Sequence, residues 1–416
     1  MPPLSQPEKD QLIAQISLEL SKTPFACKSL TQLTNGTTNF VFRAVLTHPL
    51  PLDALDGGAG NAESTTTAAA ATSTKTVIIK HSTAFAALNK DLPIDVSRCV
   101  VEESMLNALF TWNSQNTTST FRIKIPRLHL FIRGTDTNTQ VLEDIHGAVD
   151  LKALLISPSL TANSNLSHSH AMSIGRALGS WLRDYHAWVS TRSQADLRAE
   201  IEANEPMRKL KYCISYNSFI EVIQRFPEIS CTEFDKKILK DAKDMAMEEF
   251  DRKATAEEGE EWGIIHGDFW TGNVLLVLPE RQQAEEETDL FIVDWEFTQF
   301  GHRAYDIGQM IGDLLERKHF MQIDAAVWVL EGFIDGYGAV SEDMAFRIAV
   351  HTGVQLITWV TRGPPLHMRP AWATRERVVS IVELGITFIL KGWNKDMEWL
   401  KSSVLAGLLK DEQTVI

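Results

Sequence analysis

The stretch IIHGDFWTGNVLL, residues 264–276, places His266, Asp268 and Asn273 between two apolar runs. Further along the chain, FIVDWEF, residues 291–297, again sets acidic side chains within an apolar run. Short apolar runs bounded by turn residues are typical of buried strands, so the polar side chains between them belong at the edge of a core. The two segments therefore predict a functional site at the ends of buried strands.

Length and composition limit the function classes. A chain of 416 residues with 44% hydrophobic and 23% charged residues is long enough for two or more globular domains. The net charge of −14 argues against a nucleic-acid partner. The four cysteines lack CxxC or CxxH spacing, which argues against zinc sites and disulfides. No apolar stretch is long enough to span a membrane and no secretory signal is evident, so we expect a cytoplasmic protein without a membrane partner.

The hydrophobic pattern changes along the chain. Strand-like runs occur early, and residues beyond Asp306 are almost wholly helical in pattern. We therefore expect an α+β protein with a small sheet-rich N-lobe, residues 1–143, and a larger helical C-lobe, residues 144–416. Residues 48–75 are rich in Gly, Ala, Ser and Thr and predict a disordered insertion. The expected elements are helices at 8–20, 99–110 and 172–188, and strands at 76–80 and 289–293.

The spacing of Asp268 and Asn273 suits phosphoryl transfer. This reaction needs the acceptor hydroxyl to be oriented, its proton to be accepted, and magnesium to neutralise charge on the phosphates. A carboxylate serves the hydroxyl, and an amide oxygen five positions on can bind the metal. Protein kinases use the same spacing in HRD-x4-N, with arginine where Gly267 stands here. The alternative is that His266 and Asp268 only cap a turn.

The acidic pair in FIVDWEF suggests a cation site. Asp294 follows a buried strand, as does the magnesium-binding aspartate of kinases. Glu296 is two residues on, so in an extended segment both carboxylates would face the same side. Such carboxylates repel each other unless a cation lies between them. The alternative is a solvated acidic turn.

Lys80 ends the apolar run TVIIK, where it is costly to bury unless it is paired. ATP phosphates and a helix carboxylate would compensate its charge. Glu102 lies at the separation that kinases use for this carboxylate, and Glu103 is the competing partner. A surface lysine that bends towards solvent is the ordinary alternative.

Two weaker segments complete the set. The loop TNGTTN, residues 34–39, occurs where a phosphate-covering hairpin belongs, although a polar turn is the ordinary interpretation. VLEDI, residues 141–145, is an apolar strand with an acidic end, which suits the segment whose backbone bonds adenine. The order of the segments is hairpin, VxIK, helix glutamate, LED, HGD-x4-N and DWE, which is the order that a kinase requires.

These motifs, with DWEFTQFGHRAYDIG, resemble the aminoglycoside phosphotransferase and choline kinase superfamily, which has a bilobal protein-kinase-like fold. The resemblance extends from about Leu33 to about Leu390. Within the superfamily the pattern is similar to methylthioribose kinase and to fungal relatives such as 4-hydroxytryptamine kinase. Trp295 stands where methylthioribose kinases have proline, which argues against methylthioribose itself as the acceptor.

The resemblance implies roles for individual residues. Asp268 would be the catalytic base, and Asp306 would brace its loop. The ATP-binding residues would be Lys80, Glu102, Gly36, Thr37, Thr38, Asn39, Leu142, Glu143, Asp144 and Ile145. The Mg²⁺ ligands would be Asn273, Asp294 and Glu296.

No peptide-docking segment follows DWE, so we expect a small-molecule hydroxyl as the phosphoryl acceptor. The acceptor would bind between Asp268 and the C-terminal helices. The aromatic and cationic residues expected to line its pocket are Trp270, Trp359, Arg362 and Trp372, although each of these also suits ordinary packing. Two other functions stay open: a nucleotide-binding pseudokinase that serves as an interaction module, and a divergent protein kinase. The sequence does not predict an oligomeric state.

Overall fold

The computed structural model describes residues 3–33, 36–51, 73–112, 121–157, 166–253, 259, 261–277, 288–361 and 369–409. The chain divides into two compact units. The first unit is Met1–Phe110 with Pro126–His146, and the second unit is Thr111–Ile125 with Gly147–Ile416. Thr111–Ile125 belong to the second unit although they precede residue 143 in the chain, because a strand within this segment pairs with a strand of the second unit.

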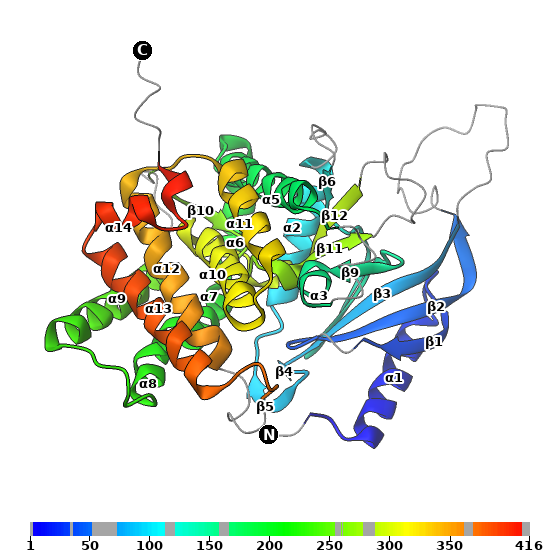
Figure 1. The fold of residues 1–416 in the computed structure, drawn as a ribbon. Helices are drawn as coiled ribbons and strands as arrows, with labels where there is room; N and C mark the ends of the chain where they lie inside the picture. The colour runs from blue at the N-terminus through cyan, green and yellow to red at the C-terminus, as the bar shows by residue number, and fades with distance from the viewer. Residues whose placement is uncertain are drawn as a thin grey trace, which may run out of the picture. The chain divides into compact units, whose positions relative to one another are not determined.

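The first unit is built on an antiparallel sheet with the strand order β1-β2-β3-β8-β7 (Figure 1). Its strands are β1 (Cys27–Gln32), β2 (Phe40–Pro51), β3 (Ser73–Thr83), β7 (Leu128–Arg133) and β8 (Thr137–Glu143). The other elements of the unit are α1 (Gln6–Leu20), the short strands β4 (Phe85–Ala86) and β5 (Asn89–Pro93), and α2 (Arg98–Trp112), whose last residues belong to the second unit.

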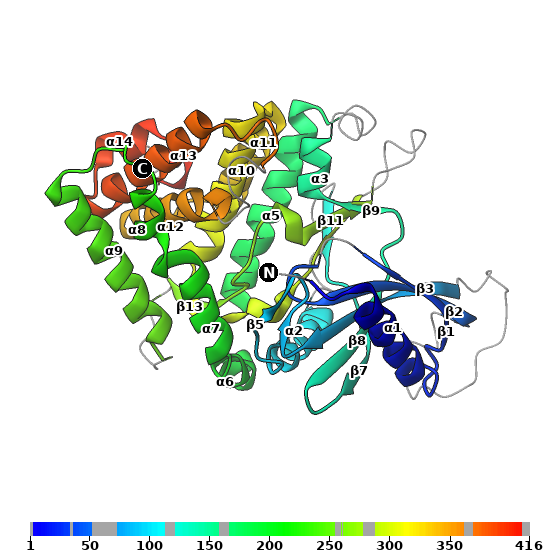
Figure 2. The same ribbon diagram turned by 90° about the horizontal axis from the view of Figure 1, so that it is seen from below.

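One face of this sheet is buried under α1. Phe40 and Phe42 of β2 alternate with less buried neighbours, as expected for a half-buried strand. Ile79 of β3 and Ile16 and Leu20 of α1 lie in the same buried cluster. In Figure 2, α1 lies over β1 to β3. Apolar burial of this kind contributes about 25 cal/mol for each Å² removed from water, so this cluster holds the strand that carries Lys80.

Two expectations for this unit need correction. The strand predicted at 76–80 is longer, Ser73–Thr83, so Lys80 lies inside a strand and not at its end. The predicted insertion at 48–75 is also shorter, because His48–Pro51 extend β2 and Ser73–Lys75 begin β3, and these two ends pair with each other. Residues 52–72 lie outside the described residues, as do Thr34 and Asn35 of the predicted hairpin.

The second unit is mostly helical but contains two small sheets. The four-stranded sheet has the order β6-β12-β11-β9, and a two-stranded sheet pairs β10 with β13. Its strands are β6 (Phe121–Lys124), β9 (Ala148–Asp150), β10 (Trp262–Ile265), β11 (Val274–Val277), β12 (Thr288–Ile292) and β13 (Gln299–His302). Its helices are α3 (Leu151–Ile156), α5 (His168–Trp188), α6 (Ala195–Glu202), α7 (Glu205–Tyr212), α8 (Phe219–Gln224), α9 (Glu233–Asp251), α10 (Ala304–Met321), α11 (Asp324–Tyr337), α12 (Glu342–Thr361), α13 (Arg375–Trp393) and α14 (Met397–Ser402).

Helices α5 and α11 lie side by side (Figures 1 and 2) and approach so closely that only glycine fits at their contact. A Cβ atom on Gly175 would lie 2.0 Å from the carbonyl oxygen of Val329, and one on Gly332 would lie 2.1 Å from that of Met172. Such distances require that something shift, so the two backbones define each other's position. This helix pair carries His186, which contacts Asp306 next to the loop of Asp268, and Tyr337, which is hydrogen-bonded to His186.

The expected α+β class is confirmed, with an antiparallel-sheet unit and a larger, mostly helical unit. Among the residues described, no helix combines the length and apolar character that crossing a membrane requires.

Candidate active site

Asp268 lies in a tight loop between β10 and β11. The loop turns at Gly267, whose φ of +79° is in the left-handed region that favours glycine. A Cβ atom at this position would also lie 2.1 Å from the carbonyl oxygen of Phe297. Glycine therefore stands where protein kinases have arginine because the backbone of a neighbouring segment occupies the space of a side chain.

Asp306, in the first turn of α10, forms hydrogen bonds with the backbone of this loop. Its Oδ2 accepts a hydrogen bond of 2.7 Å from the backbone N–H of His266, and its Oδ1 accepts one of 2.9 Å from that of Gly267. His186 of α5 lies 3.3 Å from the same carboxylate through Nε2, and its Nδ1 is bonded to the hydroxyl of Tyr337 at 3.0 Å. Asp306 is fully buried. It therefore has the bracing position expected from the sequence.

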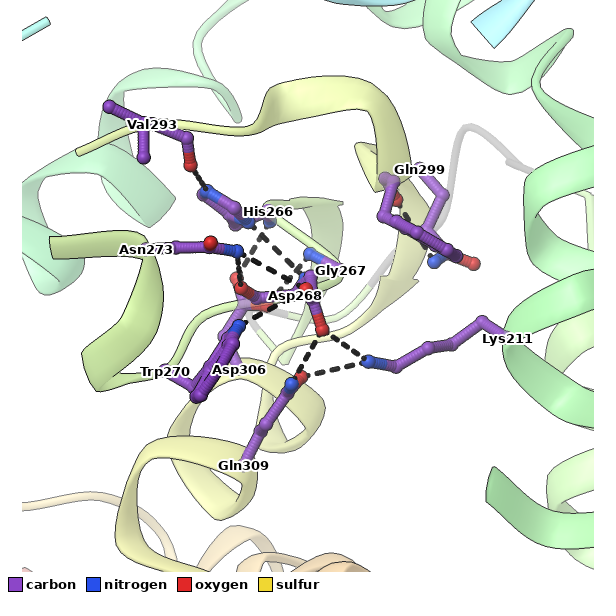
Figure 3. A network of polar contacts seen from close by, with 11 residues as sticks. Lys211, His266, Gly267, Asp268, Trp270, Asn273, Val293, Gln299, Asp306 and Gln309 are labelled. Carbon is purple, nitrogen blue, oxygen red and sulfur yellow. Dashed lines mark hydrogen bonds and ion pairs between the residues drawn. The ribbon is translucent and has the colours of Figure 1, made fainter. Parts of the chain in front are cut away.

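The carboxylate of Asp268 is surrounded by hydrogen-bond donors (Figure 3). Its Oδ1 accepts from Nε2 of Gln309 at 2.6 Å and from Nζ of Lys211 at 3.1 Å. Its Oδ2 accepts from Nδ2 of Asn273 at 3.1 Å and from Nε1 of Trp270 at 3.2 Å. Asp268, Trp270 and Asn273 were all expected to contribute to a site, and the structure brings these three together.

The environment of Asp268 favours the ionised form. Burial by itself raises the pKa of this carboxyl, but the charge of Lys211 and the hydrogen bond from Gln309 outweigh it and leave the pKa below its ordinary value. Burial also lowers the pKa of His266, which keeps that imidazole neutral. Its Nδ1 accepts from the backbone N–H of Asp268, so the proton is on Nε2, which faces the carbonyl oxygen of Val293 at 3.1 Å.

Asn273 and Asp294 are brought close by strand pairing. Val274 of β11 is opposite Ile292 of β12, and the next N–H, that of Val293, donates to the carbonyl oxygen of Asn273 at 3.0 Å. The amide nitrogen of Asn273 bonds Asp268, which turns its amide oxygen away from that carboxylate (Figure 3). Asp294 is half-buried with a φ of +71°, an uncommon conformation for a residue other than glycine.

The geometry expected for Glu296 is wrong. Trp295–Phe297 form a 3-10 turn and not an extended segment, so the period-two argument that placed Asp294 and Glu296 on one face does not hold. Glu296 is fully buried, whereas Asp294 is partly exposed. Among the described residues, no group of three or more His, Cys, Asp or Glu side chains is placed to hold a metal ion.

In the first unit, the structure decides between the two expected partners of Lys80. Nζ of Lys80 lies 2.8 Å from Oε1 of Glu102 on α2, and both side chains are buried. Glu103 forms an ion pair with Arg133 instead. The sequence left Glu102 and Glu103 open, and the helix directs Glu102 into the unit while Glu103 pairs with an exposed arginine.

The hairpin residues Gly36 to Asn39 form a turn bonded to the chain near β4. The carbonyl oxygens of Thr37 and Thr38 accept from the N–H groups of Leu88 and Ala87 at 3.2 and 3.1 Å. Asn39 is buried, and its Oδ1 accepts from Ser82 at 2.7 Å and from Arg98 at 2.8 Å. The side chain of Asn39 therefore belongs to an internal polar network of the first unit.

The expected adenine-binding segment forms the end of β8 and the residues after it. Leu142 is opposite Ile78 of β3, and Glu143 donates its N–H to the carbonyl oxygen of Arg127 at 2.9 Å. The carboxylate of Asp144 is bonded to the guanidinium of Arg43 at 2.8 and 3.0 Å. Ile145 follows this ion pair directly, so the pair fixes the chain where the strand ends.

Of the expected acceptor-binding residues, two lie together. The rings of Trp270 and Trp359 have their centroids 4.9 Å apart, and Nζ of Lys152 lies 5.3 Å from the centroid of the Trp270 ring. Arg362 lies outside the described residues. Trp372 packs against Phe320 at 5.4 Å.

Sequence reasoning missed Lys211 and Gln309. Each contacts Asp268, yet they are 57 and 41 residues away in the chain. Gln309 had a usable signal, because it follows Asp306 by one helical turn and so shares its face of α10. Lys211 shares the buried face of α7 with Met207, although its sequence surroundings are polar.

Part of the chain matches a known protein family, and two relatives are similar over most of its length. Residues 141–347 match the model of the phosphotransferase enzyme family. The chain is 28% identical over 412 residues to the phosphotransferase FrzJ of Cladobotryum sp, covering 95% of this chain and 96% of that protein. It is 23% identical over 286 residues to the 4-hydroxytryptamine kinase of Psilocybe cyanescens, covering 68% and 73% of the two chains.

Among solved structures, the aminoglycoside phosphotransferase from Streptomyces rimosus, in complex with ADP and streptomycin, aligns with a TM-score of 0.42 at 13% identity over 84% of this chain and 99% of that one. The matched region, residues 141–347, contains Asp268, Asn273, Asp294 and Asp306. Residues 141–347 are therefore a domain of the phosphotransferase enzyme family, and the chain is a phosphotransferase.

Proposed function

We propose that the protein is an ATP- and Mg²⁺-dependent kinase that transfers the γ-phosphoryl group to a hydroxyl group of a small metabolite. An amino alcohol, a sugar and a hydroxyindole are the acceptor classes to examine first. The observation that carries this proposal is the position of Asp268: a carboxylate in a braced loop, with Asn273 bonded to it and Asp294 on the neighbouring strand end.

In this proposal Asp268 acts on the acceptor. Its carboxylate accepts the hydrogen bond of the hydroxyl and takes the proton as the oxygen attacks the γ-phosphorus. The new bond joins the acceptor oxygen to phosphorus, the bond to the β,γ-bridging oxygen breaks, and ADP leaves. The braces from Asp306 matter because a positioning error of about 1 Å costs roughly a hundredfold in rate.

Nucleotide binding is the role proposed for the Lys80–Glu102 pair. A buried ammonium group is stable only when it is compensated, and Glu102 contributes to that compensation. The same ammonium group is suited to the α- and β-phosphates of ATP. In addition, Leu142 to Ile145 would contribute backbone groups to adenine, and Gly36 to Thr38 would cover the phosphates.

The residues around Asp268 fit a magnesium ion. Magnesium prefers oxygen ligands, and the amide oxygen of Asn273 is turned away from Asp268 while the carboxylate of Asp294 is partly exposed on the adjoining segment. Asn273 and Asp294 would therefore hold the ion. When bound, it would neutralise charge on the phosphates. Glu296 was expected as a further ligand on a geometry that the turn at 295–297 removes.

The proposal is tested by mixing the purified protein with Mg-ATP and a library of amino alcohols, sugars and hydroxyindoles. We expect acceptor-dependent release of ADP, with the phosphorylated product identified by ³¹P NMR. Asp268→Asn should lower turnover by about a hundredfold to ten-thousandfold, because that is the range that general-base groups contribute. The matched control is Asp289→Asn, since Asp289 also has cationic partners, Arg122 and Lys124, but lies on β12.

Two results would contradict the proposal. Nucleotide binding without ADP release across the library would favour a pseudokinase, and phosphorylation of generic protein substrates would favour a protein kinase. Full turnover by Asp268→Asn would show that another group handles the hydroxyl.

A further inference from the structure

The carboxylate of Asp268 has no acceptor position left for a substrate. A carboxylate offers about four lone-pair positions, two on each oxygen. The structure fills all four with the donors of Lys211, Gln309, Trp270 and Asn273. A hydroxyl group can therefore reach this carboxylate only if one of the four donors leaves.

The two donors to Oδ1 form a rigid pair. Lys211 comes from α7 and Gln309 from α10, and their side chains also bond each other, with Nζ donating to Oε1 at 2.9 Å. Together with Asp268 they close a triangle of three hydrogen bonds. Both residues are buried. Removing either donor would leave a buried polar group that has lost a partner, which is unfavourable.

The two donors to Oδ2 are different in kind. Both Trp270 and Asn273 come from the same loop as Asp268, and neither of their bonds is shorter than 3.1 Å. Asn273 has a second bond, from Nδ2 to the carbonyl oxygen of Asp268 at 2.9 Å, which holds it in place independently of Oδ2. Trp270 is half-buried, and its bond to Oδ2, at 3.2 Å, is the longest of the four. Its N–H is therefore the donor that is displaced at least cost.

We propose that Lys211 and Gln309 are positioning residues that fix Asp268 through Oδ1, and that Oδ2 is the atom that receives the acceptor hydroxyl once the indole N–H of Trp270 leaves it. This inference rests on the proposed function, and it assigns different tasks to the two oxygens of one carboxylate. Trp270 occupies the acceptor's hydrogen-bond position when no acceptor is bound.

Lys211→Met tests the positioning role, because methionine keeps the length of the side chain and removes its donors. We expect kcat to fall by about tenfold to a hundredfold, the range associated with a misplaced catalytic group, while KM for ATP stays unchanged. Lys211→Arg should recover part of the lost kcat, because it restores a donor and a charge. The matched control is Lys209→Met on the same helix, since Lys209 is exposed and pairs with Glu205.

Gln309→Leu tests whether the two residues act together. We expect a loss of kcat similar to that of Lys211→Met, and we expect the double variant to lose much less than the product of the two single losses. Multiplicative losses would overturn the idea of a joint Oδ1 pair. An unchanged kcat in Lys211→Met, or a loss that the control Lys209→Met shares, would overturn the positioning role.

Trp270→Phe tests the assignment of Oδ2, since it removes the N–H and keeps an aromatic ring. We expect kcat/KM for the acceptor to rise several-fold, because the acceptor no longer competes with the indole. A fall as large as that of Lys211→Met would show that the N–H of Trp270 supports the reaction, and the assignment of Oδ2 would then be wrong.

A measurement that does not depend on phosphorylation activity separates this inference from the proposed function. If the wild-type protein phosphorylates no acceptor, the proposed function fails, and thermal unfolding still tests the Oδ1 pair. The cycle of Lys211→Met, Asp268→Asn and their double variant should show a Tm loss in the double variant that is clearly smaller than the sum of the single losses. Additive losses of Tm would show that Lys211 does not hold Asp268.

Discussion

Two pairs of a buried lysine and a carboxylate, one in each unit, have the same chemistry and opposite organisation. In the first unit, Lys80 meets Glu102 at 2.8 Å, and the lysine is the group proposed to reach a ligand. In the second unit, Lys211 lies 3.1 Å from Asp268, and here the carboxylate is the group proposed to act on a ligand. The side chains of the two lysines are 7% and 8% exposed, so burial does not distinguish them.

The two pairs differ in how the proposed functional side chain is held in position. Glu102 is on a helix and Lys80 is inside a central strand of the first unit, so one ion pair joins two elements. Asp268 is on a loop and needs more support: Asp306 bonds the loop backbone, while Lys211 and Gln309 bond the carboxylate. Lys80 is thus placed by its strand, whereas the position of Asp268 depends on side chains from the two helices α7 and α10.

Of the two lysines, Lys80 should have the larger effect when it is replaced. Lys80→Met removes the charge proposed to contact the phosphates and leaves Glu102 buried without this cation. We expect kcat/KM for ATP to fall by about a hundredfold to a thousandfold, the range seen when one electrostatic contact to a reacting group is lost. Steady-state kinetics with varied ATP concentration measures the change.

Two controls sharpen this prediction. Lys90→Met removes a lysine of the same unit whose partner, Glu8, is exposed, and it should leave kcat/KM unchanged. Glu103→Gln should also have little effect, because Glu103 pairs with Arg133 and not with Lys80. Equal losses in Glu102→Gln and Glu103→Gln would contradict the assignment of Glu102.

An intermediate effect is expected for Asp306→Asn, which weakens the support of the loop and leaves Asp268 intact. The amide keeps the shape of the carboxylate but has one oxygen acceptor for the two backbone N–H groups of His266 and Gly267. We expect kcat to fall by about tenfold or more, because the catalytic group is misplaced and not removed. Asp335→Asn is the control, since Asp335 pairs with Arg176 at the surface. Unchanged kcat would show that the loop does not depend on Asp306.

The smallest effect should come from a partly exposed pair. The hydrogen bond with His302, together with that from Ser341, lowers the pKa of Glu261 to about 2. Because the folded-state pKa is below the unfolded value, this carboxylate stabilises the fold above pH 4.5 and loses that contribution as the pH falls towards 2.

Glu261→Gln should therefore lower Tm at neutral pH by only a few degrees, since solvent screens a carboxylate that is about one third exposed. The difference in Tm between wild type and variant should narrow below pH 4.5. Glu383→Gln, an exposed position on α13, is the control. A difference that stays constant between pH 7 and pH 3 would contradict the lowered pKa.

The sequence predicted those parts of the site that are local in the chain. Asp268 and Asn273 share one loop, and their spacing alone indicated that they act together. The two-unit α+β arrangement followed from the change in hydrophobic period, and the helix predicted at 99–110 differs by one or two residues at each end from α2.

The predictions that failed concerned features that depend on how the backbone runs between helices and strands and on which segments it brings together. Glu296 was placed by a strand period, but the backbone turns at Asp294 with a positive φ, which no apolar pattern signals. Lys211 was missed because its contact with Asp268 joins segments 57 residues apart, and a lysine among polar neighbours predicts a surface position. The length of β3 was underestimated because both of its ends are polar, yet the first end pairs with β2 and the last end pairs with β8.

The central claim is that the Lys80 pair serves ATP binding and the Asp268 pair serves the reaction. It is tested most directly by comparing Asp268→Asn and Lys80→Met in one experiment. The dissociation constant of ATP and the single-turnover rate at saturating ATP and acceptor are measured for both variants and for wild type. We predict that Asp268→Asn binds ATP as wild type does and reacts at least about a hundredfold more slowly, whereas Lys80→Met binds ATP more weakly. An Asp268→Asn variant that reacts at the wild-type rate would contradict the account.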